Sequence, residues 1–324
     1  MKFISFIFVF IISAASLFSD EWKNDFLLEF TPYFTLSKGR LNEYIYSSSD
    51  DSIKKSKLEW NLNPLYRFGI ESKFGWKNIF IAGQADFSLP VNCGTLYDSD
   101  WNSTGEIKTI YSKLEEKSDL IFNSSFGIGY DFNLKNKATN RKYFSISPVI
   151  NFDYSYFKIK SDNGYGYFGA EDYSKNGTDV PWDSEYARYH KVYGIDLERM
   201  YYNLFTGLIL EIYPTEKISF GCDFNFSVYS YIVTYDKHFA KNSWYNLNGY
   251  QKSPFDYLKF SFFSNYKFSN KISMRLKIGI LNGNVVKGDF YHNYYSSKPT
   301  LSRQKSGSST ILYDMNLGVI FSVL

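Results

Sequence analysis

The chain has 324 residues and carries 36 Lys and Arg against 33 Asp and Glu, so its formal net charge is only +3. This balance argues against nucleic acid or a strongly acidic protein as a partner. Aromatic residues make up 21% of the chain, yet its mean hydropathy is −0.31. A chain that is aromatic but hydrophilic overall fits one large β architecture with an apolar outer band and a polar interior.

The first segment, residues 1–19, has the features of a secretory signal peptide. Lys2 is its basic start, residues 3–12 are apolar, and residues 13–19 are rich in small side chains. Its apolar stretch is too short to span a bilayer, and no later run is apolar and long enough to do so as a helix. We therefore expect a signal peptide at 1–19, cleaved somewhere in 13–20, and one exported domain at 20–324.

From residue 26 onward, apolar and polar residues alternate with the period of two that a half-buried strand requires. The clearest segment is 79–97, where Ile81 and Phe87 share one parity and Gln84 and Asp86 take the other. About ten such segments follow one another along the chain, at 26–46, 57–72, 79–97, 118–132, 143–160, 191–213, 218–235, 255–267, 272–280 and 311–324.

The connections between these segments alternate in length. Short ones lie near 74–77, 134–141, 214–217 and 269–271, and long ones near 47–55, 98–116, 161–190, 236–254 and 283–308. This rhythm is typical of outer-membrane barrels. The prediction is an all-β fold: a transmembrane antiparallel up-and-down β-barrel of about ten strands, with long extracellular loops and short periplasmic turns. A soluble β-sandwich would also alternate, but it rarely needs so many outward aromatic residues.

The alternation assigns faces within single segments. In 57–72 it predicts that Trp60 and Leu62 face outward, while Glu59 and Asn61 line the interior.

In segment 218–235 the polar residues change parity part-way, which predicts a β-bulge near 227–230. The same strand assignment places Cys93 and Cys222 towards opposite ends of the barrel, so we expect two free thiols with no metal site between them.

Two short motifs carry ionisable side chains at the ends of these strands. Asp98 and Asp100 are spaced i, i+2, as are Asp236 and His238. In an extended chain this spacing directs both side chains of a pair to the same face. Three carboxylates and an imidazole at one barrel mouth could activate water for hydrolysis. Either pair alone is more often a solvated surface, and a zinc site would lack a second well-placed histidine.

The motifs belong to four longer segments in a fixed order: Gly39–Tyr46, Ser56–Trp60, Gly94–Trp101 and Asp236–His238. In order and rough spacing they resemble the omptin family, the ten-stranded outer-membrane endopeptidases of Gram-negative bacteria. The resemblance implies that the Asp98–Asp100 couple faces the Asp236–His238 couple across the barrel mouth. It also implies a nucleophilic water held between Asp98 and His238, so that no acyl-enzyme is formed.

The resemblance places Glu43, Leu96 and Thr234 among the substrate-binding residues. Glu43 matches the acid that receives an arginine or lysine before the scissile bond, but Thr234 stands where the second acid of that pocket is expected. The resemblance expects a further acid that favours a basic residue after the scissile bond. Ile110 stands at that position here, although Glu106, Glu115 or Glu116 could take over the role. We therefore expect a weak and broad cleavage preference, with a basic residue favoured before the scissile bond and little demand on the residue after it.

The resulting hypothesis is an endopeptidase in a bacterial outer membrane with its active site facing outward. Its partners would be peptide or protein substrates and outer-membrane lipids, with no nucleic acid and no oligomer implied. We expect no metal or other cofactor; an outer-membrane lipid, lipopolysaccharide or an equivalent, would support activity as the resemblance implies. The competing hypotheses are a non-enzymatic barrel (an adhesin or a catalytically silent omptin-like protein), a pore, and a lipid-acting barrel enzyme.

Overall fold

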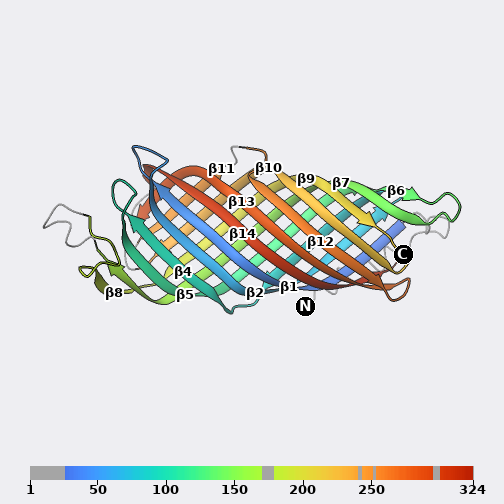
Figure 1. The fold of residues 1–324 in the computed structure, drawn as a ribbon, viewed down its shortest axis with the longest axis horizontal. Coiled ribbons are helices and arrows are strands. Elements are labelled where there is room, and N and C mark those ends of the chain that lie inside the picture. Colours follow the sequence, from blue (N-terminus) through green and yellow to red (C-terminus); the bar gives the residue numbers. More distant parts are fainter. Residues whose placement is uncertain (1–25, 170–178, 240–242, 251–252, 295–299, 324) are drawn as a thin grey trace.

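The computed structural model describes residues 26–169, 179–239, 243–250, 253–294 and 300–323, and the expected signal peptide at 1–19 lies outside this part. The described residues contain no helix of the length and apolarity needed to cross a bilayer. The strands (Figure 1) are β1 (Phe26–Tyr46), β2 (Lys54–Trp76), β3 (Ile79–Ser88), β4 (Asn92–Trp101), β5 (Lys108–Tyr130), β6 (Phe132–Lys135), β7 (Lys142–Phe168), β8 (Arg188–Val192), β9 (Ile195–Ile212), β10 (Ile218–His238), β11 (Ser243–Tyr250), β12 (Tyr257–Lys267), β13 (Ile272–Tyr294) and β14 (Thr300–Ser322).

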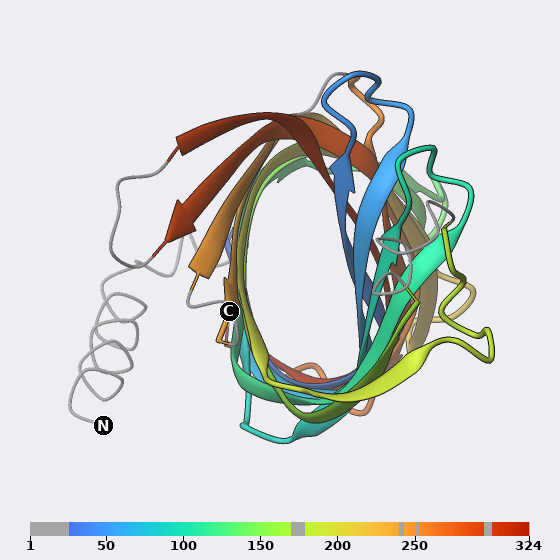
Figure 2. The same ribbon diagram turned by 90° about the vertical axis from the view of Figure 1, so that its left-hand side faces the viewer.

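The strands form one closed antiparallel barrel. The sheet closes because β1 pairs with both β2 and β14. Some positions around the ring hold two strands in line, namely β3 with β4, β5 with β6, β8 with β9, and β11 with β12, so the 14-stranded sheet makes a ring of about ten. Viewed from one end the ring is a flattened oval (Figure 2). The predicted up-and-down barrel of about ten strands is confirmed.

One part of the barrel has an apolar outer wall. On β2, the successive outward residues Tyr66, Phe68 and Ile70 are 40–44% exposed. The same kind of surface continues on other strands, for example at Leu120, Phe126 and Ile128 on β5 and at Tyr313, Met315 and Leu317 on β14. Beyond Tyr66 the outward residue is the polar, exposed Asn63. The apolar band therefore ends near Tyr66, and the barrel beyond it projects from the hydrocarbon core of the membrane.

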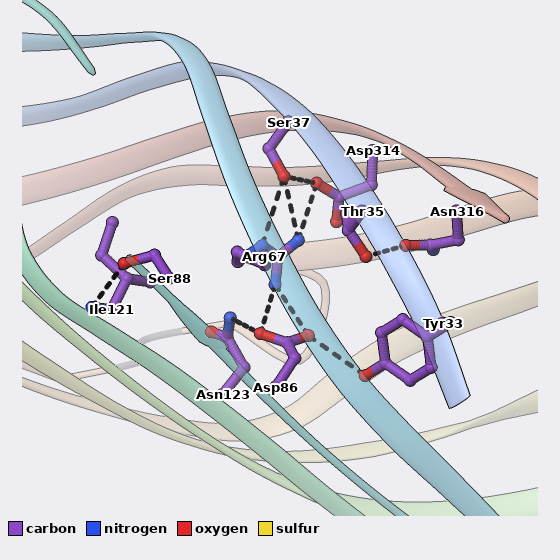
Figure 3. A network of polar contacts seen from close by, with 10 residues as sticks. All are labelled: Tyr33, Thr35, Ser37, Arg67, Asp86, Ser88, Ile121, Asn123, Asp314 and Asn316. Carbon is purple, nitrogen blue, oxygen red and sulfur yellow. Dashed lines mark hydrogen bonds and ion pairs between the residues drawn. The ribbon is translucent and has the colours of Figure 1, made fainter. Parts of the chain in front are cut away.

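Inside the apolar band the lumen is filled by a network of charged and polar side chains (Figure 3). Arg67 donates from Nη1 to both oxygens of Asp86, at 2.9 and 3.0 Å, and its Nη2 lies 2.9 Å from Asp314 Oδ1. Tyr33 and Asn123 also donate to the Asp86 carboxylate. A cavity of about 170 Å³ remains among these and neighbouring residues. The network compensates the buried charges and ties five strands together across the interior.

Beyond this network, an apolar layer fills the interior. Its members come from strands around the ring and are 0–1% exposed at Leu41, Trp60, Leu62, Leu96, Leu114, Ile159 and Leu197. The prediction that Trp60 and Leu62 face outward, with Glu59 and Asn61 inside, is therefore wrong. The reason is an irregularity in the pairing of β1 with β2, where Ser37 pairs with Leu65 but Gly39 pairs with Leu62. One extra residue on β2 inverts the two faces of everything beyond it.

The predicted bulge in β10 is confirmed. Its pairing with β9 shifts register between Ser227 and Tyr229, within the expected range 227–230. The shift turns the later residues of β10 so that Thr234 and Asp236 lie inside, at 1% and 3% exposure. Farther down the barrel, Cys93 and Cys222 are both free thiols.

Three of the loops that we expected to be long are largely strand. In the expected loop 283–308, β13 continues to Tyr294 and β14 begins at Thr300. β4 continues to Trp101 and β5 begins at Lys108, so only a short turn separates them within the expected loop 98–116. Likewise β10 continues to His238, inside the expected loop 236–254. Polar residues do not interrupt these strands, because backbone pairing continues beyond the membrane where both faces can be polar. The two ionisable motifs therefore lie on paired strands.

Candidate active site

The Asp236–His238 pair is formed on β10. His238 Nε2 and Asp236 Oδ2 are 2.7 Å apart, and the two side chains are 15% and 5% exposed. Asp236 pairs in register with Leu197 of β9, which belongs to the apolar layer, so its side chain points inward. A buried carboxylate bonded to one ring nitrogen fixes the orientation of the imidazole and supports it when it takes up a proton.

Asp98 and Asp100 lie on β4, on the same face as Leu96. Asp98 pairs in register with Leu58 of β2, and both Leu58 and Leu96 belong to the apolar layer. The i, i+2 spacing then directs Asp100 inward as well, one step nearer the turn at the end of β4. The two carboxylates thus stand on the interior wall just above the apolar layer.

β4 and β10 lie on opposite walls of the ring. On one side β5, β7 and β9 separate them, and on the other side β2, β1, β14, β13 and β11 do so. At this level the interior is narrow enough for opposite walls to touch. Glu43 of β1 and Arg199 of β9 meet across it, with Oε1 and Nη2 only 2.8 Å apart.

This cross-wall ion pair links the two motifs. Glu43 pairs in register with Leu58, which pairs with Asp98, so the three residues form one row across β1, β2 and β4. Neighbouring strands are about 4.8 Å apart, so Glu43 and Asp98 have backbones roughly 10 Å apart. On the other wall Arg199 pairs with Thr234, two residues before Asp236. The ion pair therefore lies at the base of the space between the two motifs.

Glu43 is a substantially perturbed acid. It is 2% exposed and lies well beyond the apolar outer band, and burial raises the pKa of Glu43 to about 8, against the opposing effect of Arg199. Asp236 and His238 also act on the Glu43 carboxyl, the first raising and the second lowering its pKa. These electrostatic effects indicate that the Asp236–His238 pair lies near Glu43.

Sequence reasoning missed Arg199. This residue stands in an inward row of β9 between Leu197 and Tyr201, and it is 0% exposed. An arginine among apolar inward residues was a usable signal of a buried ion pair, because a charged side chain is rarely buried without an oppositely charged partner.

The other residues assigned to substrate binding also lie inside the barrel. Leu96 is part of the apolar layer at 0% exposure, and the Thr234 hydroxyl accepts from Arg199 Nε at 3.1 Å. Ile110 pairs directly with Asp100, so an uncharged residue stands there. Among the acids that could replace it, Glu116 is 1% exposed and accepts from the Asn61 backbone at 3.2 Å.

No arrangement of three or more His, Cys, Asp or Glu side chains suited to a metal ion is found among the described residues. The Asp236 Oδ1 atom is buried and has no hydrogen-bond partner within the described part of the chain. A buried carboxylate oxygen of this kind is where a water or substrate group would be expected to donate.

The sequence matches the family model of the omptin family over residues 34–323. The chain belongs to the omptin family. As an omptin, it is similar in fold to the crystal structure of the outer-membrane protease OmpT from Escherichia coli, with a TM-score of 0.76, 12% identity, and coverage of 91% of this chain and 96% of that one. The Pseudomonas putida toluene transporter TodX covers 94% of this omptin at 8% identity, but with a TM-score of 0.30. No curated protein matches this omptin in sequence.

Omptin membership and the barrel fold together support a protease of the outer membrane.

Proposed function

We propose that this omptin is an endopeptidase that uses a water activated between the Asp98–Asp100 couple and the Asp236–His238 couple. The observation that carries the proposal is the 2.7 Å contact between His238 and Asp236 on the inner face of β10. It supplies an oriented base on one wall, and Asp98 supplies an inward carboxylate on the opposite wall.

In the proposed reaction, the oxygen of the water attacks the peptide carbonyl carbon while its proton passes to Nδ1 of His238, the ring nitrogen that does not face Asp236. Asp236 stabilises the imidazolium that forms, and Asp98 holds the water through a hydrogen bond. Collapse of the tetrahedral intermediate breaks the C–N bond, and His238 returns the proton to the leaving amine. Asp100 supports Asp98, because neighbouring carboxylates tend to share a proton.

The surroundings support hydrolysis by a held water. The apolar layer beneath the motifs closes the interior, so water and substrate reach the site from the loop end of the barrel. We propose that this end faces outside the cell, where peptides and proteins are the substrates, and that an outer-membrane lipid supports activity. The basic-residue preference that the resemblance implies is not carried into this proposal, because Glu43 already binds Arg199.

The test is cleavage of a random peptide library by refolded protein, with sequencing of the cut ends. His238→Ala and Asp98→Ala should each lower kcat by about 10²–10⁴-fold, the range for loss of general acid–base catalysis. Unchanged melting by circular dichroism would show that the barrel still folds. If the wild-type protein cuts no peptide in the presence of outer-membrane lipid, the non-enzymatic barrel becomes the better account.

A further inference from the structure

The residue beneath the proposed site that the reaction does not use is Arg199. Every nitrogen of its guanidinium has a partner. Nη2 donates to Glu43 Oε1 at 2.8 Å and to the Asn42 carbonyl at 3.3 Å. Nε donates to Thr234 at 3.1 Å, and Nη1 donates to the Tyr201 hydroxyl at 3.2 Å. Partners on three strands hold the group in one place, and it is 0% exposed.

The Glu43–Arg199 ion pair lies where it would contact any peptide bound between the two motifs. Glu43 shares a row with Asp98, and Thr234 is two residues from Asp236. If a scissile bond lies between Asp98 and His238, a neighbouring side chain of the substrate points towards the floor that Glu43 and Arg199 form. This placement rests on the proposed function, since it takes the two motifs as the cleavage site.

The floor carries no net negative charge in either protonation state of Glu43. Arg199 stays charged at any accessible pH. When Glu43 is ionised the pair is neutral, and when Glu43 is protonated the floor is positive. Burial raises the pKa of Glu43, which favours the positive state of the floor as the pH falls. A lysine or arginine side chain of a substrate would therefore meet a like charge instead of a free acid.

We propose that Arg199 is a specificity-determining residue. Its guanidinium binds the Glu43 carboxyl, which would otherwise bind a cationic side chain of the substrate, and the site therefore selects an uncharged side chain next to the scissile bond. Glu43 and Arg199 then form a floor that offers no free acid to a substrate cation, and the enzyme cuts beside uncharged residues in preference to basic ones. Selectivity of this kind arises by rejecting the wrong substrate as much as by binding the right one.

The experiment compares two peptides that differ only at the residue before the cleaved bond, arginine in one and norleucine in the other. The wild-type protein should show at least tenfold higher kcat/KM on the norleucine peptide. Arg199→Met should raise kcat/KM on the arginine peptide at least tenfold, because it frees Glu43. Arg199→Lys keeps the charge and is the matched control. Equal cleavage of both peptides by wild-type protein, or no gain in the Met variant, would overturn the proposal.

Arg199→Met leaves Glu43 buried without its partner, so that variant can fail to fold. The double variant Arg199→Met with Glu43→Gln removes both charges, and it should lose the discrimination against arginine without gaining a preference for it. Peptide affinities measured by fluorescence anisotropy in a His238→Ala background separate this inference from the proposed function. If wild-type protein does not cleave but the His238→Ala background still binds norleucine peptide more tightly, the proposed reaction fails and the role of Arg199 stands; equal affinities refute that role.

Discussion

Replacing Asp236 with asparagine is the substitution that the site geometry predicts most directly. Asn has the shape of Asp but not its charge, so the barrel should be preserved while the 2.7 Å charge-assisted contact with His238 Nε2 is lost. A hydrogen bond to a charged group contributes about 1.5–3 kcal/mol. At about 1.4 kcal/mol per tenfold, Asp236→Asn should lower kcat by roughly 10–150-fold if the carboxylate acts mainly when the imidazole is protonated in the transition state.

The assay is kcat on a peptide selected from the library, measured with refolded protein in lipid-containing micelles. Asp119→Asn is the matched control, because Asp119 pairs with two lysines outside the site, at 2.9 Å from Lys158 and 3.1 Å from Lys160, and its side chain is 32% exposed. The control should keep wild-type kcat. An Asp236→Asn protein that is folded and retains full kcat would refute the role given to this carboxylate.

Three further predictions concern the pH response and the barrel. Because burial raises the pKa of Glu43 to about 8, ionisation above that pH should offset Arg199, and the norleucine-to-arginine ratio of kcat/KM should fall between pH 7 and 9; a flat ratio would contradict the charge assignment. Arg67→Met should lower the free energy of unfolding by about 3–5 kcal/mol in urea titrations, since it strands Asp86 without its bidentate partner. Phe126→Arg should lower the free energy of unfolding in lipid vesicles by about 2–4 kcal/mol, because Phe126 is 59% exposed on the apolar wall. An unchanged free energy of unfolding would mean that the membrane contacts another part of the barrel.

Alternation, together with the loop rhythm and the many outward aromatic residues, was enough to predict the barrel, because in the membrane every strand must be apolar outside and polar inside. Within segment 79–97, β3 (Ile79–Ser88) follows that rule, whereas the residues from Asn92 on form a separate strand, β4, whose Leu96 is part of the apolar interior layer. Beyond the membrane the requirement reverses, since the interior needs an apolar layer and the outside meets water. Trp60 and Leu62 belong to that reversed part, so extending the membrane parity through them gave the wrong face.

The candidate site was only partly predictable for a different reason. The i, i+2 spacing fixes which side chains share a face, and this was sufficient for Asp98 with Asp100 and for Asp236 with His238. The spacing says nothing about partners on the opposite wall. Arg199 lies 156 residues from Glu43 in sequence, and only the flattened ring brings them together. The acidic pocket implied by the resemblance was therefore expected to be free.

The most direct test of the account is the separation between Asp98 and His238 in a high-resolution crystal structure of the lipid-bound protein. A single water can bond to both groups only if an Asp98 carboxylate oxygen and His238 Nδ1 lie about 4–6 Å apart, because twice a hydrogen-bond length is the upper limit. The account predicts that spacing with an ordered water between the two atoms. Side chains that are much farther apart, or that point towards the bilayer, would contradict hydrolysis by a water held between the two walls.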